Sequence, residues 1–124
     1  RIRAIVTSCG FTAFHHYYEG KLAGWTSPRY MPRIAQEYGN SPDRVPFDFY
    51  EVVAALAPRP VFINAPIRDG NFAVTGVRKV VTQAKLIYQL RGATDALRAE
   101  YPESAHDFPD AIREAAYQWL DDRL

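Results

Sequence analysis

Residues 97–109 have the sequence LRAEYPESAHDFP, and this stretch indicates how the whole chain is folded. Residues 97–101 alternate in polarity, which is typical of a β-strand near the edge of a sheet. An amphipathic helix is expected to begin near Pro109, because proline is tolerated in the first turn of a helix. His106 then lies on a loop between a strand and a helix, at the rim of a sheet. An imidazole takes and returns a proton near neutral pH, so His106 is a candidate general base.

Two further strands are expected upstream of this stretch. Residues 2–7 and 61–65 are short, β-branched and nearly all apolar, as in strands that are covered on both faces. Strands that alternate with helices imply parallel pairing and right-handed crossovers. The predicted fold class is therefore α/β, with three parallel strands alternating with helices and one long aromatic-rich loop.

The clearest helix is expected at residues 76–91. Its apolar positions recur at helical spacing, and Gly92 after its end fits a C-terminal stop. Its expected buried face comprises Val77, Val80, Val81, Ala84, Ile87 and Tyr88. A shorter helix is expected at residues 49–57, with Asp48 as its N-cap and Val52, Val53 and Leu56 on its buried face.

Residues 10–48 form the longest stretch without clean periodicity. They contain several glycines and prolines together with many aromatic residues. Long connections of this kind are uncommon and often functional, so we expect a cap or lid wall with a short helix near residues 31–38. Its aromatic residues either line a pocket or form the core of the cap, and the core is expected for most of them. The aromatic residues considered for the pocket are Tyr17, Tyr18, Trp25 and Tyr30.

The composition is that of an ordinary globular domain. The chain has 124 residues, of which 48% are hydrophobic and 23% charged, enough for one compact domain. Its formal net charge is +1 and its Lys and Arg residues are scattered, so neither a nucleic acid nor an anionic membrane surface is expected as a partner. No apolar run approaches the roughly 20 residues of a membrane span. Because Cys9 is the single cysteine, no internal disulfide and no cysteine-based metal site is expected. No cofactor is predicted.

Parallel strands end at one edge of a sheet, and the segments after the three strands bring candidate residues to that edge. These segments are residues 8–10, 68–70 and 105–107. Asp69 is the best candidate to hold the second nitrogen of His106, because a carboxylate orients a histidine base and stabilises the imidazolium that forms. The alternatives are that Asp69 only caps a turn and that His106 only packs between a loop and a helix.

Other polar residues near the predicted site have simpler interpretations. Asp107 is expected to cap the final helix, and Glu103 is expected to be a solvated loop charge. His15 and His16 are neighbours in sequence, and such pairs rarely point at one metal ion. We expect both histidines at surface or lid positions.

The sequence contains no convincing nucleophile. Ser8 and Cys9 lie at the right edge of the sheet and in the order nucleophile, acid, base, but residues 7–11 (TSCGF) do not match the G-x-S-x-G elbow. No helix is expected directly after them. The preferred interpretation is that Cys9 is buried, or that it contacts the residues that position the site, and that it is not the nucleophile.

Several motifs resemble the C-terminal part of an α/β-hydrolase. They are VTSCGF at residues 6–11, APRPVFINAP at residues 57–66, Asp69, and HDFP at residues 106–109. The likeness is strongest to the dienelactone-hydrolase and acetylxylan-esterase-like group, which shades into the prolyl-oligopeptidase-type peptidases. It covers essentially the whole chain.

The resemblance implies a catalytic triad of which this chain holds two members. Asp69 would be the acid and His106 the base, and the serine elbow would lie upstream of Arg1. Residues 1–124 would then be a partial α/β-hydrolase domain without its nucleophile-bearing N-terminal half. As the C-terminal segment of a serine hydrolase, the chain would act on small-molecule carboxylic esters only within a longer protein.

The resemblance also leaves two alternatives and one structural expectation. The chain would otherwise be a segment of a prolyl-oligopeptidase-type peptidase or amidase, or a non-catalytic binding or assembly module with a hydrolase fold. In every case the strand at residues 2–7 is expected to present an open sheet edge. The missing N-terminal half or another chain would cover that edge.

Overall fold

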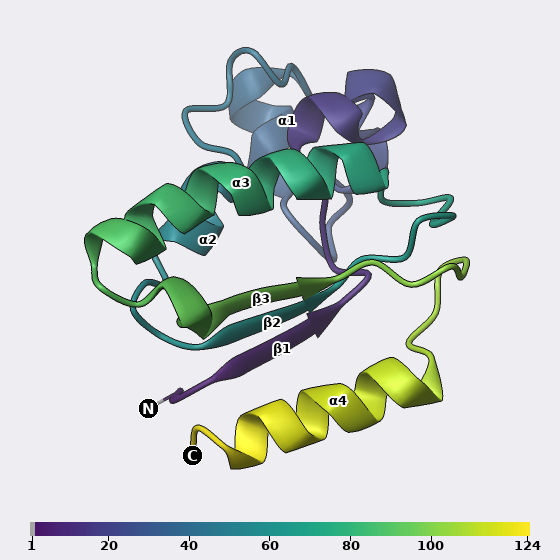
Figure 1. Cartoon of the computed structure of the whole chain (residues 1–124). Coiled ribbons are helices and arrows are strands. Elements are labelled where there is room, and N and C mark those ends of the chain that lie inside the picture. Colours follow the sequence, from purple (N-terminus) through teal and green to yellow (C-terminus); the bar gives the residue numbers. More distant parts are fainter. Residues whose placement is uncertain (1) are drawn as a thin grey trace.

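The fold is a parallel β-sheet with helices on both faces (Figure 1). The computed structural model describes residues 2–124, and Arg1 lies outside the described residues. Within residues 2–124 the sheet has three strands in the order β1-β2-β3, and both pairings are parallel. The strands are β1 (Ile5–Ser8), β2 (Val61–Asn64) and β3 (Leu97–Glu100). The predicted α/β class and the parallel topology are confirmed, although each strand is shorter than its sequence pattern predicts.

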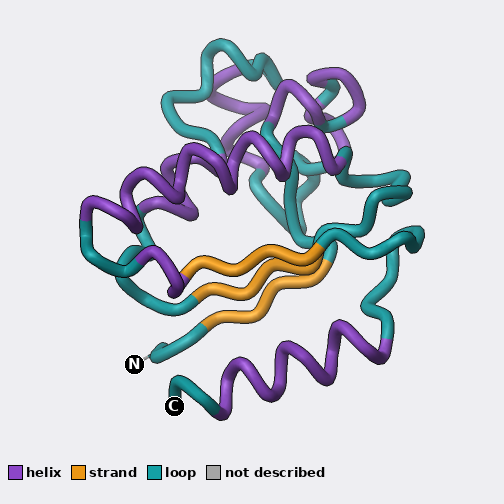
Figure 2. Tube along the Cα trace, viewed as in Figure 1, coloured by secondary structure: helices purple, strands orange, loops and turns teal. Residues whose placement is uncertain are grey.

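The helices lie on the two sides of this sheet (Figure 2). The α-helices of the described chain are α1 (Pro32–Tyr38), α2 (Phe49–Ala54), α3 (Val74–Leu90) and α4 (Asp110–Asp121). Short 3-10 turns occur at Phe14–His16, Tyr18–Gly20, Leu22–Gly24 and Thr94–Ala96. Helix α4 covers one face of the sheet alone, whereas α3 covers the other face together with α2 and the segment of residues 10–48.

The helix ends follow from the local sequence. The Asp48 carboxylate accepts a hydrogen bond from the Phe49 amide at 2.6 Å, and the Glu51 carboxylate accepts one from the Asp48 amide at 2.8 Å. This capping box starts α2 at the predicted residue. Helix α3 ends just before Gly92, whose φ of +66° is the left-handed conformation of a helix stop. Pro109 is the N-cap residue of α4, one position earlier than the first turn.

Two apolar cores flank the sheet. The larger core lies between one face of the sheet and α3, where Val77 and Tyr88 are almost fully buried. The smaller core lies on the opposite face, where Phe62 of β2 packs against Ala116 and Trp119 of α4. Successive residues of β2 face opposite cores, which explains why the whole strand is buried.

The aromatic-rich segment of residues 10–48 packs as part of the larger core. The rings of Tyr17 and Trp25 stack in parallel, with their centres 4.4 Å apart and an angle of 2° between their planes. Stacked aromatic pairs bury large apolar areas and fix ring orientation. Tyr18 and Tyr30 are 50% and 66% exposed. Tyr17 and Trp25 are therefore buried in the core and also border a cleft, whereas Tyr18 and Tyr30 are exposed, Tyr30 at the same cleft.

Three expectations about burial are wrong. The sequence pattern predicts a first strand covered on both faces, but all four residues of β1 are only half-buried. The reason is that β1 pairs only with β2 within residues 2–124, so its outer edge is open. Val52 and Ile87, predicted on buried faces, are 42% and 40% exposed. Val53 of α2 is buried as predicted, whereas Val52 of the same helix is not, and Ile87 borders a groove between α2 and α3.

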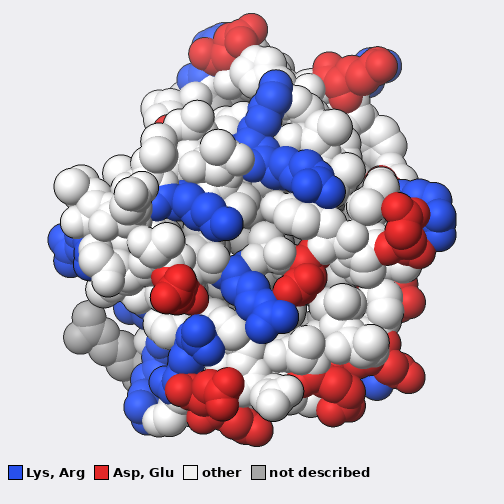
Figure 3. Space-filling model, viewed as in Figure 1, with Lys and Arg blue, Asp and Glu red and all other residues white. Residues whose placement is uncertain are grey.

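Charges of both signs are mixed on the surface. On the face drawn in Figure 3, Lys and Arg side chains alternate with Asp and Glu side chains and with uncharged surface. Exposed ion pairs such as Arg33–Glu37, with 2.7 Å between nitrogen and oxygen, reflect this mixing. Among residues 2–124, no helix has both the length and the apolar character that crossing a membrane requires.

Candidate active site

The loops after β2 and β3 run side by side, and this brings Asp69 and His106 together. The two strands are parallel neighbours, so both loops leave the same edge of the sheet. Their pairing continues beyond the strands, because the Ile67 amide donates a hydrogen bond to the Pro102 carbonyl at 2.9 Å. The parallel topology therefore places the predicted acid and base at one rim.

The side chains of Asp69 and His106 are in direct contact. Nδ1 of His106 lies 3.1 Å from each carboxylate oxygen of Asp69. The Asp69 side chain is 1% exposed, whereas the His106 side chain is 47% exposed. Within the described chain, Nε2 of His106 has no hydrogen-bond partner. The ring is thus held by a buried carboxylate on one side and is open to a ligand on the other.

Asp69 is fixed by the turn that follows it. Its Oδ1 accepts hydrogen bonds from the backbone amides of Asn71 at 2.8 Å and Phe72 at 3.1 Å. Burial by itself raises the pKa of Asp69, but the Asn71 amide, the His106 ring and the Phe72 amide together outweigh burial and hold that pKa below its usual value. Asp69 is therefore ionised at neutral pH. The same carboxylate caps a turn and contacts the histidine, so both sequence interpretations of Asp69 apply.

Asn71 contacts the pair, and the sequence did not reveal it. Its Nδ2 lies 3.4 Å from Nδ1 of His106, and its Oδ1 accepts a hydrogen bond from the Tyr18 hydroxyl at 2.9 Å. Tyr18 has a φ of +43°, a left-handed conformation that is uncommon for tyrosine. The segment of residues 10–48 is therefore tied to Asp69 and His106 through one amide side chain.

Asn64 is a second residue that sequence reasoning missed. It ends β2, is 1% exposed, and its Nδ2 donates hydrogen bonds to Ser8 Oγ and to the Asp107 carbonyl, both at 2.8 Å. Asn64 therefore joins the end of β1 to the loop that carries His106. A single amide within an apolar strand was the available signal, because a buried polar group needs partners.

Ser8 and Cys9 lie at the end of β1, against the same loop. Cys9 has a φ of +49°, and its Sγ donates a hydrogen bond to the Asp107 carbonyl at 3.3 Å. Burial raises the pKa of the Cys9 thiol, the hydrogen bond from Ser8 opposes this rise, and the charge of Asp69 adds to it. The thiol is therefore protonated at neutral pH, which agrees with a supporting role for Cys9 and disfavours a nucleophilic one.

Comparison with known proteins identifies the fold. No protein-family model matches the chain, and no curated protein matches it in sequence. A carbohydrate esterase family 15 glucuronoyl esterase from Caldicellulosiruptor kristjansonii matches 99% of the chain with a TM-score of 0.82 and 18% identity. A promiscuous family 15 esterase from the marine bacterial metagenome matches 99% with a TM-score of 0.69 and 14% identity. Methylesterase BT1017 matches 59% with a TM-score of 0.50 and 25% identity.

This chain has the fold of the C-terminal part of an α/β-hydrolase. The resemblance stated from the motifs is thereby confirmed for the fold. The chain spans 37% and 36% of the lengths of the two family 15 esterases and 16% of the length of the methylesterase. In an α/β fold the sites form beyond the carboxyl ends of the strands, which is where Asp69 and His106 meet.

Two acidic residues, Asp107 and Glu103, lie on the same loop as His106. The expectation that Asp107 caps α4 is wrong, because Asp107 lies two positions before the N-cap residue Pro109 and its exposed side chain makes no cap bond. Its backbone carbonyl is the part that contacts Asn64. Glu103 is exposed as expected, and its ion pair with Arg68 at 3.0 Å links the two loops.

His15 and His16 have different surroundings. His15 Nε2 lies 2.8 Å from Asp43 Oδ1 in an exposed pair. His16 Nδ1 is buried without a hydrogen-bond partner in the described chain, and burial lowers the pKa of His16 below its usual value. The two side chains therefore do not converge on a common ligand.

A cleft of about 750 Å³ opens in front of His106, beyond the carboxyl ends of the strands, where sites form in open α/β sheets. Its walls are mainly aromatic, and Arg29 adds a cation. The principal lining side chains are Cys9, Tyr17, Trp25, Tyr30, Phe72 and His106. This volume suits a small molecule. The candidate site is therefore the acid–base pair together with this cleft.

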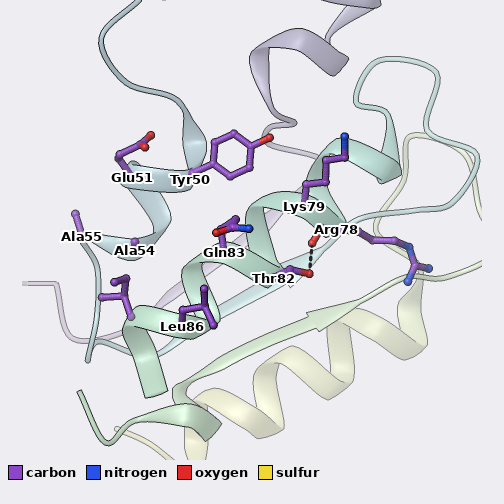
Figure 4. Close-up of a pocket in the computed structure, with 10 residues that line it drawn as sticks. Tyr50, Glu51, Ala54, Ala55, Arg78, Lys79, Thr82, Gln83 and Leu86 are labelled. Carbon is purple, nitrogen blue, oxygen red and sulfur yellow. Dashed lines mark hydrogen bonds between the residues drawn. The ribbon is translucent and has the colours of Figure 1, made fainter. Parts of the chain in front are cut away.

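A larger hollow of about 1040 Å³ lies elsewhere, between α2 and α3. Figure 4 shows Ala54 of α2 and the following Ala55 on one wall and Leu86 of α3 on the other, with Lys79 at the edge. No acid and base are paired among the described residues that line it. Size alone does not make a catalytic site, so we place the candidate active site at the smaller cleft.

Proposed function

We propose that this chain supplies the acid and the base of a serine esterase that cleaves small-molecule carboxylic esters. The observation that carries the proposal is the 3.1 Å contact between Nδ1 of His106 and the buried Asp69 carboxylate, at the mouth of an aromatic cleft. A buried carboxylate behind a half-exposed imidazole is the arrangement that a catalytic triad requires. The esterase names of the fold neighbours support ester hydrolysis as the reaction.

In the complete enzyme, His106 moves protons between the serine, the leaving group and water. Nε2 of His106 takes the hydroxyl proton as the serine oxygen attacks the ester carbonyl, and Asp69 stabilises the imidazolium. The ring then gives this proton to the leaving oxygen, so the alcohol departs and an acyl-enzyme remains. Water loses a proton to the same Nε2, attacks the acyl-enzyme and releases the acid, and the serine regains its proton.

The cleft provides the surroundings for this chemistry. The ring centre of Phe72 lies 5.9 Å from that of His106, and the stacked Tyr17 and Trp25 continue the apolar wall. Such walls exclude water and bind the apolar part of an ester. Arg29 lines the same cleft without an ion-pair partner in residues 2–124, so it is available to a polar group of the substrate.

The serine would come from a segment upstream of this chain, whose sequence has no G-x-S-x-G motif. Two observations support this part of the proposal. The chain spans little more than a third of the family 15 esterases, at 37% and 36%. The outer edge of β1 is unpaired within the described residues, so a further strand of a missing N-terminal half can add there.

The test is ester hydrolysis by the full-length parent protein. His106→Ala and Asp69→Asn should each lower turnover by at least about 10³-fold, because each removes one member of a triad. His15→Ala is a matched control, since His15 pairs with exposed Asp43 away from the cleft, and it should retain activity. Near-normal turnover in both site variants would overturn the proposal.

The substrate panel of this assay separates the remaining alternatives. Cleavage of amides in preference to esters would assign the segment to a peptidase or amidase. A parent sequence without a serine elbow, together with no hydrolysis of either class, would assign it to a binding or assembly module.

A further inference from the structure

Cys9, Asp69 and His106 form a cluster that the proposed hydrolysis does not explain. The Cys9 sulfur, an Asp69 carboxylate oxygen and a His106 ring nitrogen all lie within 4.8 Å of one another. They come from three different segments, which follow β1, β2 and β3. Ester hydrolysis uses Asp69 and His106, but it requires no chemistry of the Cys9 thiol.

The spacing of these atoms is close to that of a zinc site. With bonds of about 2.0–2.1 Å to nitrogen and oxygen, a tetrahedral zinc ion separates these two ligands by about 3.3 Å. The observed distance between Nδ1 of His106 and either Asp69 oxygen is 3.1 Å. A sulfur bound at about 2.3 Å lies about 3.6 Å from the ligand oxygen. In the cluster the sulfur lies within 4.8 Å of an Asp69 oxygen and of a His106 ring nitrogen, so binding requires the sulfur to approach both ligands.

The carboxylate oxygen that zinc needs is available. Oδ1 of Asp69 accepts hydrogen bonds from the backbone amides of Asn71 and Phe72, and these bonds fix the orientation of the carboxylate. Among the hydrogen bonds of the described residues, Oδ2 takes part only in the one with the His106 ring. Asp69 can therefore bind a metal through Oδ2 while Oδ1 keeps its hydrogen bonds to the turn at residues 69–72. This is the kind of outer support that metal ligands require.

The thiol also has the support that a metal-bound thiolate requires. The Ser8 hydroxyl lies 3.6 Å and the Asn64 amide nitrogen 3.9 Å from Cys9 Sγ, and both groups carry hydrogen-bond donors. Donors around a thiolate stabilise it and orient it toward the metal. Cys9 and His106 both border the cleft, which gives an ion a path of entry and leaves room for a water.

We propose that this cluster binds Zn²⁺ through Cys9 Sγ, Asp69 Oδ2 and His106 Nδ1, with a water as the fourth ligand. The thiol releases its proton to solvent as the Zn–S bond forms, and the imidazole binds in its neutral form with its proton on Nε2. Sulfur, nitrogen and carboxylate oxygen in tetrahedral array are ligands that zinc accepts. Magnesium and calcium select all-oxygen sites, so the sulfur favours zinc over both.

Zinc at this position inhibits the acid–base pair. With the metal on Nδ1 the ring carries its proton on Nε2, so Nε2 has no lone pair to accept the serine proton. Asp69, bound to the metal, no longer stabilises an imidazolium. This consequence rests on the proposed function, whereas the binding of zinc rests on the cluster alone.

Cobalt substitution tests the binding without any substrate. The metal-free 124-residue chain is titrated with Co²⁺ while its absorbance is recorded, and Zn²⁺ is then added as a competitor. We expect one ion per chain, with a thiolate-to-cobalt charge-transfer band that Zn²⁺ abolishes. Cys9→Ser should eliminate the band, and His106→Ala should weaken binding at least about tenfold. His15→Ala, which alters an exposed histidine outside the cluster, should change neither.

Several results would overturn the proposal. The absence of a charge-transfer band in the wild-type chain, or a band that survives in Cys9→Ser, excludes the site. Far-UV circular dichroism checks the fold of each variant, and His106→Gln repeats the test with a side chain of closer size. The same titration on the longer parent repeats it where the β1 edge is covered. Ester hydrolysis by the parent that persists at saturating Zn²⁺ would overturn the inhibition separately from the binding.

Discussion

The side-chain amide of Asn64 donates a hydrogen bond of 2.8 Å to the backbone carbonyl of Asp107. This bond ties the end of β2 to the loop that carries His106. The same amide donates to Ser8 Oγ at 2.8 Å, so one buried group holds the ends of β1 and β2 and the histidine loop together. The position of His106 relative to Asp69 therefore depends on Asn64, although Asn64 makes no hydrogen bond to either side chain.

Replacement of Asn64 by leucine tests this anchor. Leucine has a similar size but no donor, so the Asp107 carbonyl and the Ser8 hydroxyl lose a partner in a buried place. We expect the free energy of unfolding of the chain to fall by about 1–3 kcal/mol, measured by urea denaturation. Gln89→Leu, at an exposed position of α3, is the control and should change it by less than about 0.5 kcal/mol. Equal stability of Asn64→Leu and wild type would exclude the anchoring role.

The pKa of Asp69 predicts how stability depends on pH. Folding lowers this pKa below the unfolded value of 3.8, so the ionised carboxylate stabilises the folded state. The contribution is fully present above the unfolded pKa and is lost as the pH falls through the lower, folded pKa. We therefore expect Asp69→Asn to reduce the free energy of unfolding at neutral pH and to make it less sensitive to acid below pH about 4. Urea denaturation at a series of pH values measures both effects.

Asp43→Asn is the control for this pH series. The Asp43 side chain is 84% exposed, so its substitution removes a carboxylate without removing buried hydrogen bonds. The free energy of unfolding of Asp43→Asn should depend on pH in the same way as that of the wild-type chain. If the difference between Asp69→Asn and wild type stays constant from neutral to acid pH, the Asp69 carboxylate is not the group that carries the dependence.

Gly76 allows the start of α3 to lie directly against residues 12–16. A Cβ atom at position 76 would overlap Thr12 Oγ1 and would lie 2.6 Å from the Cβ of His16. At an exposed helical site, Gly→Ala stabilises a protein by about 0.5–1 kcal/mol. Here we expect the opposite sign, a loss of about 1–3 kcal/mol in the free energy of unfolding, because of overpacking.

Gly70→Ala is the matched control for this substitution. No atom lies within 4 Å of a Cβ built at position 70, so the added methyl group meets open space. Thermal unfolding of the two variants should therefore diverge, with only Gly76→Ala melting below wild type. Equal melting of both would show that α3 can move away from residues 12–16 at little cost.

The alternation of strands and helices is predictable from this sequence because each signal is local. The Asp48 capping box and the Gly92 stop act within a few residues of the helix ends that they define. The burial of β1 is not predictable in this way, because it depends on a neighbouring strand that residues 2–124 do not provide. Local sequence therefore predicts the elements, whereas their burial depends on what surrounds them.

Some residues of the candidate site can be predicted from the sequence and others cannot. Asp69 and His106 can be proposed from sequence, because parallel strands bring the residues after them to one edge. Asn71 and Tyr18 cannot, since their contact depends on the left-handed backbone of Tyr18 and on the path of a long segment. Cys9 is visible in the sequence, but its closeness to the pair follows from three-dimensional convergence alone.

The last prediction concerns the Tyr18 hydroxyl, which holds the side-chain amide of Asn71 in contact with His106. It donates to Asn71 Oδ1 at 2.9 Å, and Asn71 Nδ2 lies 3.4 Å from Nδ1 of the histidine. In the full-length parent, Tyr18→Phe should lower kcat by about 2- to 10-fold and leave KM nearly unchanged, as expected for one lost hydrogen bond of about 0.5–1.5 kcal/mol that acts on positioning. Phenylalanine and tyrosine have the same backbone preferences, so the left-handed φ of +43° costs the variant nothing extra.

Tyr30→Phe provides the comparison for Tyr18→Phe. Tyr30 also lines the cleft, but its hydroxyl makes no hydrogen bond to other residues of the described chain. The loss of that hydroxyl should leave kcat within about 2-fold of wild type, since no bond to the pair is removed. If the two variants lower kcat equally, the effect arises from the polarity of the cleft. If Tyr18→Phe alone is slower, the segment of residues 10–48 positions the histidine through Asn71.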